Sequence, residues 1–324
     1  MSKKTGGQTV GDWDSIHLQL SLIMWRSSPT RRSRCVGFDS SRSRFGFAKL
    51  LPISRSMPFT VTHIAAAVPI AWLCRWRVPF SALAIGCAIP DIAAFYPAWI
   101  DYRATHSIMG ILTHCLPIGV AFYYLYQSLL KRPLADLLPK RLSERLWPWL
   151  DKPIDFSIPA IAAVIACVMF GAGTHVLWDS FTHGGRWGVQ QFPVLKTTAI
   201  SLSDRAISWY SVLQHLSSVV FLPPMLLGFY IWIRRQPRDP NQRCHFQLPR
   251  SVTWPVLGLM MLTMVAHLVW TRLKHPSDSL LGVAAYSIKQ SGALMMIIVL
   301  LYCISMHVIW ALQRDETQPT ASET

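Results

Sequence analysis

Seven long apolar runs, separated by short polar and basic stretches, constrain the fold of this chain more than any other feature. They lie near residues 58–74, 78–100, 107–130, 156–178, 209–233, 252–270 and 290–312. About 20 apolar residues in a helix cross the hydrocarbon core of a bilayer, and the last five runs reach that length. The first run is short and Pro90-Asp91 interrupts the second, so this pair either spans or is partly re-entrant. The sequence thus predicts an all-α, polytopic helical membrane protein with about six to seven apolar helices.

The positive charge of the chain fits a membrane protein better than a nucleic-acid-binding one. The formal net charge is +15, yet only 15% of the residues are charged and 52% are hydrophobic. Lys and Arg gather in the loops at 131–155 and 234–251, which the positive-inside rule places in the cytoplasm. The loops at 101–106 and 179–208 are then external. Because no basic face or recognition module accompanies the charge, we expect membrane lipid rather than nucleic acid as a partner.

The two ends of the chain differ from the apolar region between them. Residues 1–56 are rich in Arg and Ser, which predicts a disordered basic tail or a translation start assigned upstream of the true start at Met57. We expect a membrane domain at 57–235, a pair of transmembrane helices at 236–312 and a disordered tail at 313–324. The seven cysteines form no CxxC pair, so neither a disulfide framework nor a cysteine zinc site is expected.

The strongest local motif is Gly173-Thr-His175-Val-Leu-Trp-Asp179-Ser-Phe-Thr-His183-Gly-Gly185, at the predicted external end of the fourth run. On a helix, His175, Asp179 and His183 recur every four residues and share one face, as a metal ion requires of ligands from a single helix. An aspartate at a membrane boundary beside two histidines suggests a functional site. A metal site and a structural polar cluster are both open at this point.

Other polar residues fall toward the same end of their runs. These are His63, Asp91, His106 and His215. An unpaired aspartate in an apolar run costs several kcal/mol, so Asp91 needs a partner such as a metal ion. The alternatives for Asp91 are a helix N-cap or an ion pair with Arg103. For His215, a hydrogen bond across helices and metal ligation are equally compatible with its position.

Several of these motifs together resemble the bacterial membrane proteins grouped as domain of unknown function 4184. The matching pieces are Met57-Pro-Phe-Thr-x-x-His63, Pro90-Asp91, Thr105-His106-Ser107, Thr174-His175-x-x-Trp178-Asp179-Ser-Phe-Thr-His183 and Leu213-Gln-His215-x-Ser217-Ser218. The resemblance covers about residues 57–235, so the fold it implies is again a multi-pass membrane protein.

A more distant similarity carries a mechanism. The order His, Asp, His and His-x-x-x-Asp resembles that of the zinc-dependent phospholipase C and P1 nuclease group and of related membrane-bound metal-dependent hydrolases. The resemblance implies that Asp91, His106, His175 and Asp179 share a zinc ion and that His63 binds a second metal. The soluble enzymes add a later His-x-x-x-Glu pair, whereas neither His183 nor His215 has a glutamate four residues on. A full trinuclear site is therefore not implied.

Two functions follow as hypotheses. The first is a zinc-dependent hydrolase of the bacterial inner membrane that cleaves a phosphoester or a lipid headgroup at the external face. In it, Asp91 or Asp179 accepts a proton, and His183 orients water or protonates the leaving group. Arg103 or Arg186 pairs with a phosphate. The second is a non-enzymatic membrane protein, a transporter or an assembly factor, in which the same groups line a pathway or hold a structural metal.

Overall fold

The computed structural model describes residues 60–202, 205–238, 250–276 and 280–317. All of them belong to one compact unit, Pro52–Thr324. The predicted basic tail at 1–56, the Met57-Pro58-Phe59 opening of the family motif and residues 318–324 lie outside the described part of the chain.

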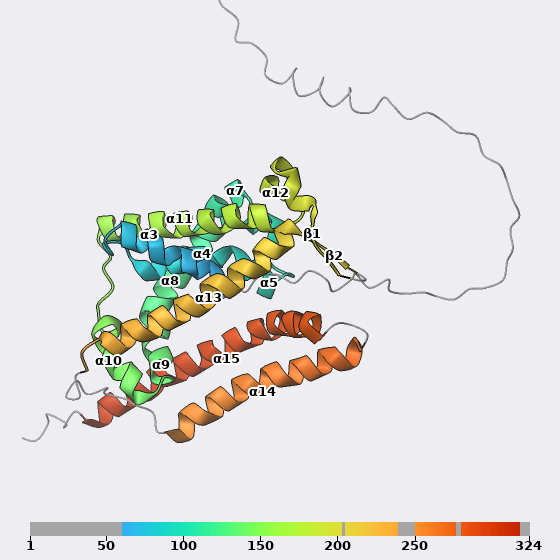
Figure 1. The fold of residues 1–324 in the computed structure, drawn as a ribbon. Coiled ribbons are helices and arrows are strands. Elements are labelled where there is room, and N and C mark those ends of the chain that lie inside the picture. Colours follow the sequence, from blue (N-terminus) through green and yellow to red (C-terminus); the bar gives the residue numbers. More distant parts are fainter. Residues whose placement is uncertain (1–59, 203–204, 239–249, 277–279, 318–324) are drawn as a thin grey trace, which may run out of the picture. The chain divides into compact units, whose positions relative to one another are not determined.

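Nearly all of the described regular structure is helical (Figure 1). The first half contains α2 (Thr60–His63), η1 (Ile64–Ala66), α3 (Ala67–Leu73), α4 (Phe80–Ala88), η2 (Ile89–Asp91), α5 (Ile92–Phe95), α6 (Tyr102–Thr105), α7 (Ile108–Gly110), η3 (Ile111–Cys115), α8 (Leu116–Leu125), η4 (Tyr126–Leu130), α9 (Lys131–Asp136) and α10 (Lys140–Leu150). The second half contains α11 (Ile158–Thr182), α12 (Trp187–Gln191), η5 (Pro193–Lys196), β1 (Thr198–Leu202), β2 (Arg205–Ser208), α13 (Trp209–Arg235), α14 (Arg250–Lys274) and α15 (Leu280–Thr317). The strands form an antiparallel hairpin in which Leu202 faces Arg205.

Five described helical segments are long and apolar enough to cross a membrane. They are Ile108–Asp136, Ile158–Gln191, Trp209–Arg235, Thr253–Lys274 and Tyr286–Gln313, and they match the last five predicted runs. The first two runs form the shorter apolar helices Val61–Leu73 and Phe80–Phe95. The predicted all-α, polytopic helical fold is confirmed, and the protein is a membrane protein.

The second apolar run is broken where the sequence places its proline. Pro90 has no backbone N–H and clashes with the preceding turn of an α-helix, so α4 ends at Ala88. The 3-10 turn η2 follows, and α5 resumes at Ile92. Asp91 therefore sits at a helix break inside an apolar segment, where its side chain is buried.

The core around this break is formed by α4 packed along α11 (Figure 1). Two glycines allow the backbones to approach, because a Cβ on Gly86 would lie 2.5 Å from the Val168 carbonyl oxygen and a Cβ on Gly171 would lie 2.5 Å from that of Leu83. The buried positions of α11 recur every three or four residues and include Val164, Val168, Gly171, Ala172, His175, Asp179 and Thr182. His175 and Asp179 thus continue the apolar stripe that faces the core.

The described basic residues Arg145, Arg234 and Arg235 lie at the opposite end of α13 from the predicted site residues. At one end, the Arg145 guanidinium on α10 donates to the carbonyl oxygens of Arg234 and Gln236. At the other end, Gln214 contacts His183. Gln214 and Arg234 are 20 residues apart on one helix, which corresponds to about 30 Å at 1.5 Å per residue, the thickness of a bilayer core. This separation agrees with the predicted topology.

The helices α14 and α15 pack on each other, and α15 also contacts the preceding helices. The Tyr302 hydroxyl donates to the Pro133 carbonyl oxygen over 3.2 Å. Helix α15 continues to Thr317, beyond residue 312, where the sequence predicted the last helix to end and a tail to begin. Since neither Gly nor Pro occurs between Ala293 and Thr317, nothing in the local sequence stops the helix earlier.

Candidate metal site

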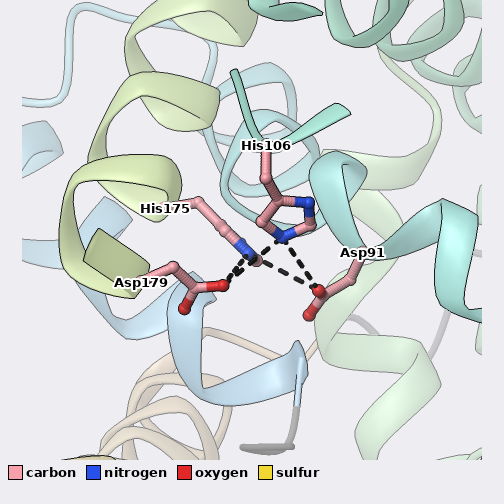
Figure 2. A group of neighbouring side chains, drawn as sticks. All are labelled: Asp91, His106, His175 and Asp179. Carbon is pink, nitrogen blue, oxygen red and sulfur yellow. Dashed lines mark ion pairs between the residues drawn. The ribbon is translucent and has the colours of Figure 1, made fainter. Parts of the chain in front are cut away.

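Four buried side chains converge beside the C-terminal end of α11. Figure 2 shows them pointing toward one another. Asp91 comes from η2, His106 follows α6, and His175 and Asp179 lie one turn apart on α11. One ligand atom of each residue lies within 4.8 Å of the others. We call these residues the four-residue cluster. They are the four ligands that the distant family resemblance implied.

The ion pairs within the four-residue cluster each join a histidine Nε2 to a carboxylate oxygen. His106 Nε2 lies 3.4 Å from Asp91 Oδ1 and 3.3 Å from Asp179 Oδ2. His175 Nε2 lies 3.6 Å from Asp91 Oδ1 and 3.5 Å from Asp179 Oδ2. Hydrogen bonds to nitrogen are usually about 2.7–3.2 Å long, so these distances exceed a normal hydrogen bond.

The same distances fit a shared cation. Zinc binds histidine nitrogen at about 2.0–2.1 Å and carboxylate oxygen at about 2.0–2.2 Å, which places tetrahedral ligand atoms about 3.3–3.6 Å apart. Two imidazoles and two carboxylates are also a donor set suited to zinc and to other first-row divalent metals. The four-residue cluster can therefore hold a divalent metal ion without a large rearrangement of its ligand atoms.

The hydrogen bonds at the far side of each imidazole leave Nε2 available. His175 Nδ1–H donates to the Cys87 carbonyl oxygen over 2.7 Å, and His106 Nδ1–H donates to the Tyr102 carbonyl oxygen over 3.0 Å. Because a carbonyl oxygen only accepts, the proton of each neutral ring is on Nδ1 and Nε2 carries a lone pair. Both Nε2 atoms are buried without a hydrogen-bond partner among the described residues. Such a lone pair and a carboxylate oxygen repel each other, so a cation between them would stabilise the arrangement.

A tight turn holds His106 in this orientation. Ser107 caps α7, because its hydroxyl oxygen accepts from the Gly110 N–H over 2.9 Å and donates to the Ala104 carbonyl oxygen over 2.9 Å. A Cβ on Gly110 would lie only 1.6 Å from the Ala104 carbonyl oxygen, so the turn requires glycine there. The Thr105-His106-Ser107 motif thus owes its geometry to a helix cap and a close backbone approach.

The side chain of Asp91 neither caps a helix nor pairs with Arg103, which were the two alternatives to metal binding. Asp91 precedes α5, but its carboxylate makes no capping hydrogen bond. Its described ion pairs are with His106 and His175, whereas Arg103 is exposed and bonds through its backbone N–H to Asp101. Asp91 faces two histidines, as expected of a metal ligand.

Two further histidines approach the other oxygen of Asp179. His63 Nε2 lies 3.5 Å and His183 Nδ1 lies 3.4 Å from Asp179 Oδ1. The His63 ring stacks on that of His175, with centroids 3.7 Å apart. The predicted helical repeat of His175, Asp179 and His183 is wrong at its last member, because α11 ends at Thr182 and His183 has an extended backbone. Gly184 and Gly185 follow at once, and glycine favours the end of a helix.

Tyr102 is a site residue that the sequence did not reveal. Its hydroxyl donates to Asp179 Oδ2 over 3.4 Å, and its ring stacks on His106 with centroids 3.8 Å apart. Burial, together with the Asp179 and Asp91 carboxylates, raises the pKa of Tyr102, so the phenol stays protonated and can donate. No motif marks Tyr102, although it lies one helical turn before His106.

Of the remaining candidates, Arg186 lies beside the site and His215 lies outside it. Arg186 is half-buried beside the site, where its Nη1 donates to the His106 carbonyl oxygen over 3.1 Å and its guanidinium lies 5.5 Å from the centre of the Tyr102 ring. His215 is exposed on α13 and is not a member of the four-residue cluster. Its neighbour Gln214 is buried instead and reaches His183.

The comparisons with known proteins agree with the motifs. A family model described as domain of unknown function (DUF4184) matches residues 57–312, which extends beyond the motifs at 57–235 and includes α14 and most of α15. No curated protein and no solved structure matches the chain. The match covers well over half of the sequence, and the chain belongs to the DUF4184 family.

Proposed function

We propose that this protein is a metal-dependent hydrolase that binds zinc in the four-residue cluster and cleaves a phosphoester, such as a lipid headgroup, at the membrane surface. The observation that carries the proposal is the pair of buried, unpartnered Nε2 atoms of His106 and His175, each facing two carboxylates. A bound zinc ion would lower the pKa of a coordinated water toward about 7 and polarise a phosphoryl oxygen.

The protein's own groups supply the other requirements of hydrolysis. Both oxygens of Asp179 face nitrogen atoms, whereas only Oδ1 of Asp91 does so among the described ion pairs, so we assign proton acceptance to Asp91 rather than to Asp179. Arg186 keeps further N–H groups beside the cluster and would pair with a phosphate oxygen. Arg103 is exposed and is the weaker candidate for this role. His183 lies beside Asp179 Oδ1, and both of its ring nitrogens have contacts, so in this proposal it positions Asp179 and does not take the predicted role on the water or the leaving group.

His63 is suited to a second ion that shares Asp179. Its Nε2 is buried without a hydrogen-bond partner among the described residues, and so is Asp179 Oδ1, 3.5 Å away. This distance again matches two ligand atoms on one tetrahedral ion. The proposal therefore includes His63 as a ligand of a second metal.

The placement of the site supports a surface reaction rather than transport. From His175 toward the N-terminal end of α11, the buried residues are Ala172, Gly171, Val168, Cys167 and Val164. This buried face of α11 therefore offers no chain of polar side chains for transport across the bilayer. With the basic loops in the cytoplasm, the site would open at the external face of a bacterial inner membrane. A membrane phospholipid would then reach it from the outer leaflet.

The test of the proposal is the metal content and the activity of the purified protein. We expect stoichiometric zinc by elemental analysis and release of a phosphorylated headgroup from phospholipid nanodiscs. The His175→Ala and Asp179→Ala double variant should lose both, and the His215→Gln variant should lose neither. A wild-type protein without zinc, manganese or iron, or a double variant with as much metal as wild type, would refute the metal site. Metal binding without hydrolysis of any phosphoester would leave the alternative, a structural metal in a transporter or an assembly factor.

A further inference from the structure

A buried glutamine connects α13 to the metal site through His183. The Gln214 side chain is 5% exposed, and its Nε2 lies 3.3 Å from His183 Nε2. An amide nitrogen can only donate a hydrogen bond, so His183 Nε2 must accept it. The residue that faces the site from α13 is therefore Gln214 and not the neighbouring His215.

This contact determines where His183 carries its proton. A neutral imidazole that accepts at one nitrogen is protonated at the other, which places the proton of His183 on Nδ1. Nδ1 lies 3.4 Å from Asp179 Oδ1 and 3.2 Å from Thr182 Oγ1. Because Thr182 Oγ1 donates to the Trp178 carbonyl oxygen, it accepts from His183 Nδ1–H, which lies beside the Asp179 carboxylate. A protonated Nδ1 cannot bind a metal ion.

The position of His183 in the chain suits it to holding Asp179. Its backbone N–H donates to the Asp179 carbonyl oxygen over 3.1 Å, so the residue is tied to the last turn of α11. A carboxylate ligand can rotate about its Cβ–Cγ bond unless a neighbour holds its other oxygen, and such neighbours orient metal ligands in proteins. The Nδ1–H of His183 lies 3.4 Å from Oδ1, beyond a normal hydrogen bond, and the positive end of this N–H beside Oδ1 favours the rotamer in which Oδ2 is directed toward His106 and His175.

We infer that Gln214 is a positioning residue of the metal site: it holds His183 with the proton on Nδ1, and His183 in turn fixes the Asp179 carboxylate. The inference rests on the proposed function, because a metal ion is what Asp179 is positioned to bind. It makes His183 a neighbour that orients a ligand rather than a ligand itself. It also gives a role to the Leu213-Gln214 part of the family motif.

The protonation of His183 can be measured without any metal. We would label the metal-free protein with ¹⁵N-histidine and assign the His183 signals by their loss in His183→Gln, since ¹⁵N shifts separate protonated from unprotonated ring nitrogens. The expected result is a protonated Nδ1 and an unprotonated Nε2 in wild type. In Gln214→Glu, an ionised carboxylate would accept from Nε2–H and reverse the pattern. A protonated Nε2 in wild type would overturn the inference.

The positioning role can be measured as a coupling between two residues. The zinc dissociation constant, from competition with a chromophoric chelator, should rise about 10-fold or more in Gln214→Ala and in His183→Ala, the range typical of residues that orient ligands. If Gln214 acts through His183, the double variant should be no weaker than His183→Ala alone. An equal loss from Gln214→Ala in the His183→Ala background would show that Gln214 acts only on the fold and would overturn the inference.

The chain offers a matched control in Gln127. Its Nε2 donates to Ser81 Oγ over 3.0 Å, so it is also a partly buried glutamine that hydrogen-bonds between helices, but at a position away from the cluster. Gln127→Ala should leave the zinc dissociation constant unchanged, and a rise equal to that of Gln214→Ala would count against a specific role for Gln214. A wild-type protein that binds no zinc would refute the proposed function, whereas the ¹⁵N shifts would still decide the protonation of His183.

Discussion

Removal of the metal ion should destabilise the protein by an amount that the site allows us to work out. In the metal-free state, His106 Nε2 and His175 Nε2 are buried and lack hydrogen-bond partners among the described residues. An unsatisfied buried polar atom costs about 1–3 kcal/mol, so the two nitrogens cost roughly 2–6 kcal/mol in the free energy of unfolding. For a domain of about 250 residues, 1 kcal/mol shifts Tm by about 2–4 °C, which gives a fall of roughly 4–24 °C on chelation.

The assay compares thermal unfolding of the detergent-solubilised protein with and without excess chelator. Tryptophan fluorescence can follow the transition, since the chain has 14 tryptophans. Readdition of zinc should restore Tm, and the gain should grow with the free zinc concentration as mass action requires, by about 2.7 kcal/mol at 100 times the dissociation constant. The His175→Ala and Asp179→Ala double variant should unfold at the same temperature with and without chelator.

One outcome would refute this reasoning. If the histidines are protonated and simply pair with the two carboxylates, no cation is missing from the metal-free protein, and chelation would leave Tm unchanged. An unchanged Tm in a protein that also purifies without metal would identify the four-residue cluster as a buried ion-pair network. The Gln127→Ala variant serves as control, because it weakens a helix contact but should keep the full response to chelator.

Three further predictions test the packing, the boundary of the site and the topology. Gly171→Ala should lower the free energy of unfolding by about 1–3 kcal/mol, because its Cβ would meet the α4 backbone, whereas Gly173→Ala on the same helix enters open space and should not destabilise; thermal unfolding compares the two. His215→Gln should bind as much zinc as wild type in elemental analysis, and a loss of metal would place His215 in the site. Cysteines introduced at the exposed positions Lys152 and Lys196 should react with an impermeant reagent from opposite faces of the membrane, and labelling from one face would disprove the predicted topology.

The membrane spans and the ligands could be predicted from the sequence because each depends on local pattern. The five long runs have the length and hydropathy of membrane helices, and these properties need no knowledge of packing. His175 and Asp179 are four residues apart, so any helix brings them to one face. Asp91 was a candidate because an unpaired aspartate inside an apolar run needs a partner, and the distant resemblance added His106 to the ligand set. The structure brings all four together.

The residues that the sequence missed depend on helix rotation and on contacts between helices. Consecutive residues on a helix point about 100° apart, so a position near the external end of α13 could not distinguish Gln214 from His215. Gln214 and Ser217 share the buried face of α13, while His215 lies with the exposed Leu216 and Val219. The apolar residues around His215 were the available signal, since they mark a face that meets lipid.

The helix break at Pro90 determines part of the geometry of the candidate metal site. Because the proline ends α4 at Ala88, Cys87 lies in the last turn of that helix, where carbonyl oxygens lack a helical partner. That carbonyl oxygen accepts from His175 Nδ1–H, which leaves Nε2 free for a metal ion. The close approach at Gly86 and Gly171 brings α4 and α11 near enough for this bond. The same break places Asp91 beside His175. The interruption of the helix at Pro90 therefore positions one ligand of the site and leaves free the carbonyl oxygen whose hydrogen bond orients another ligand.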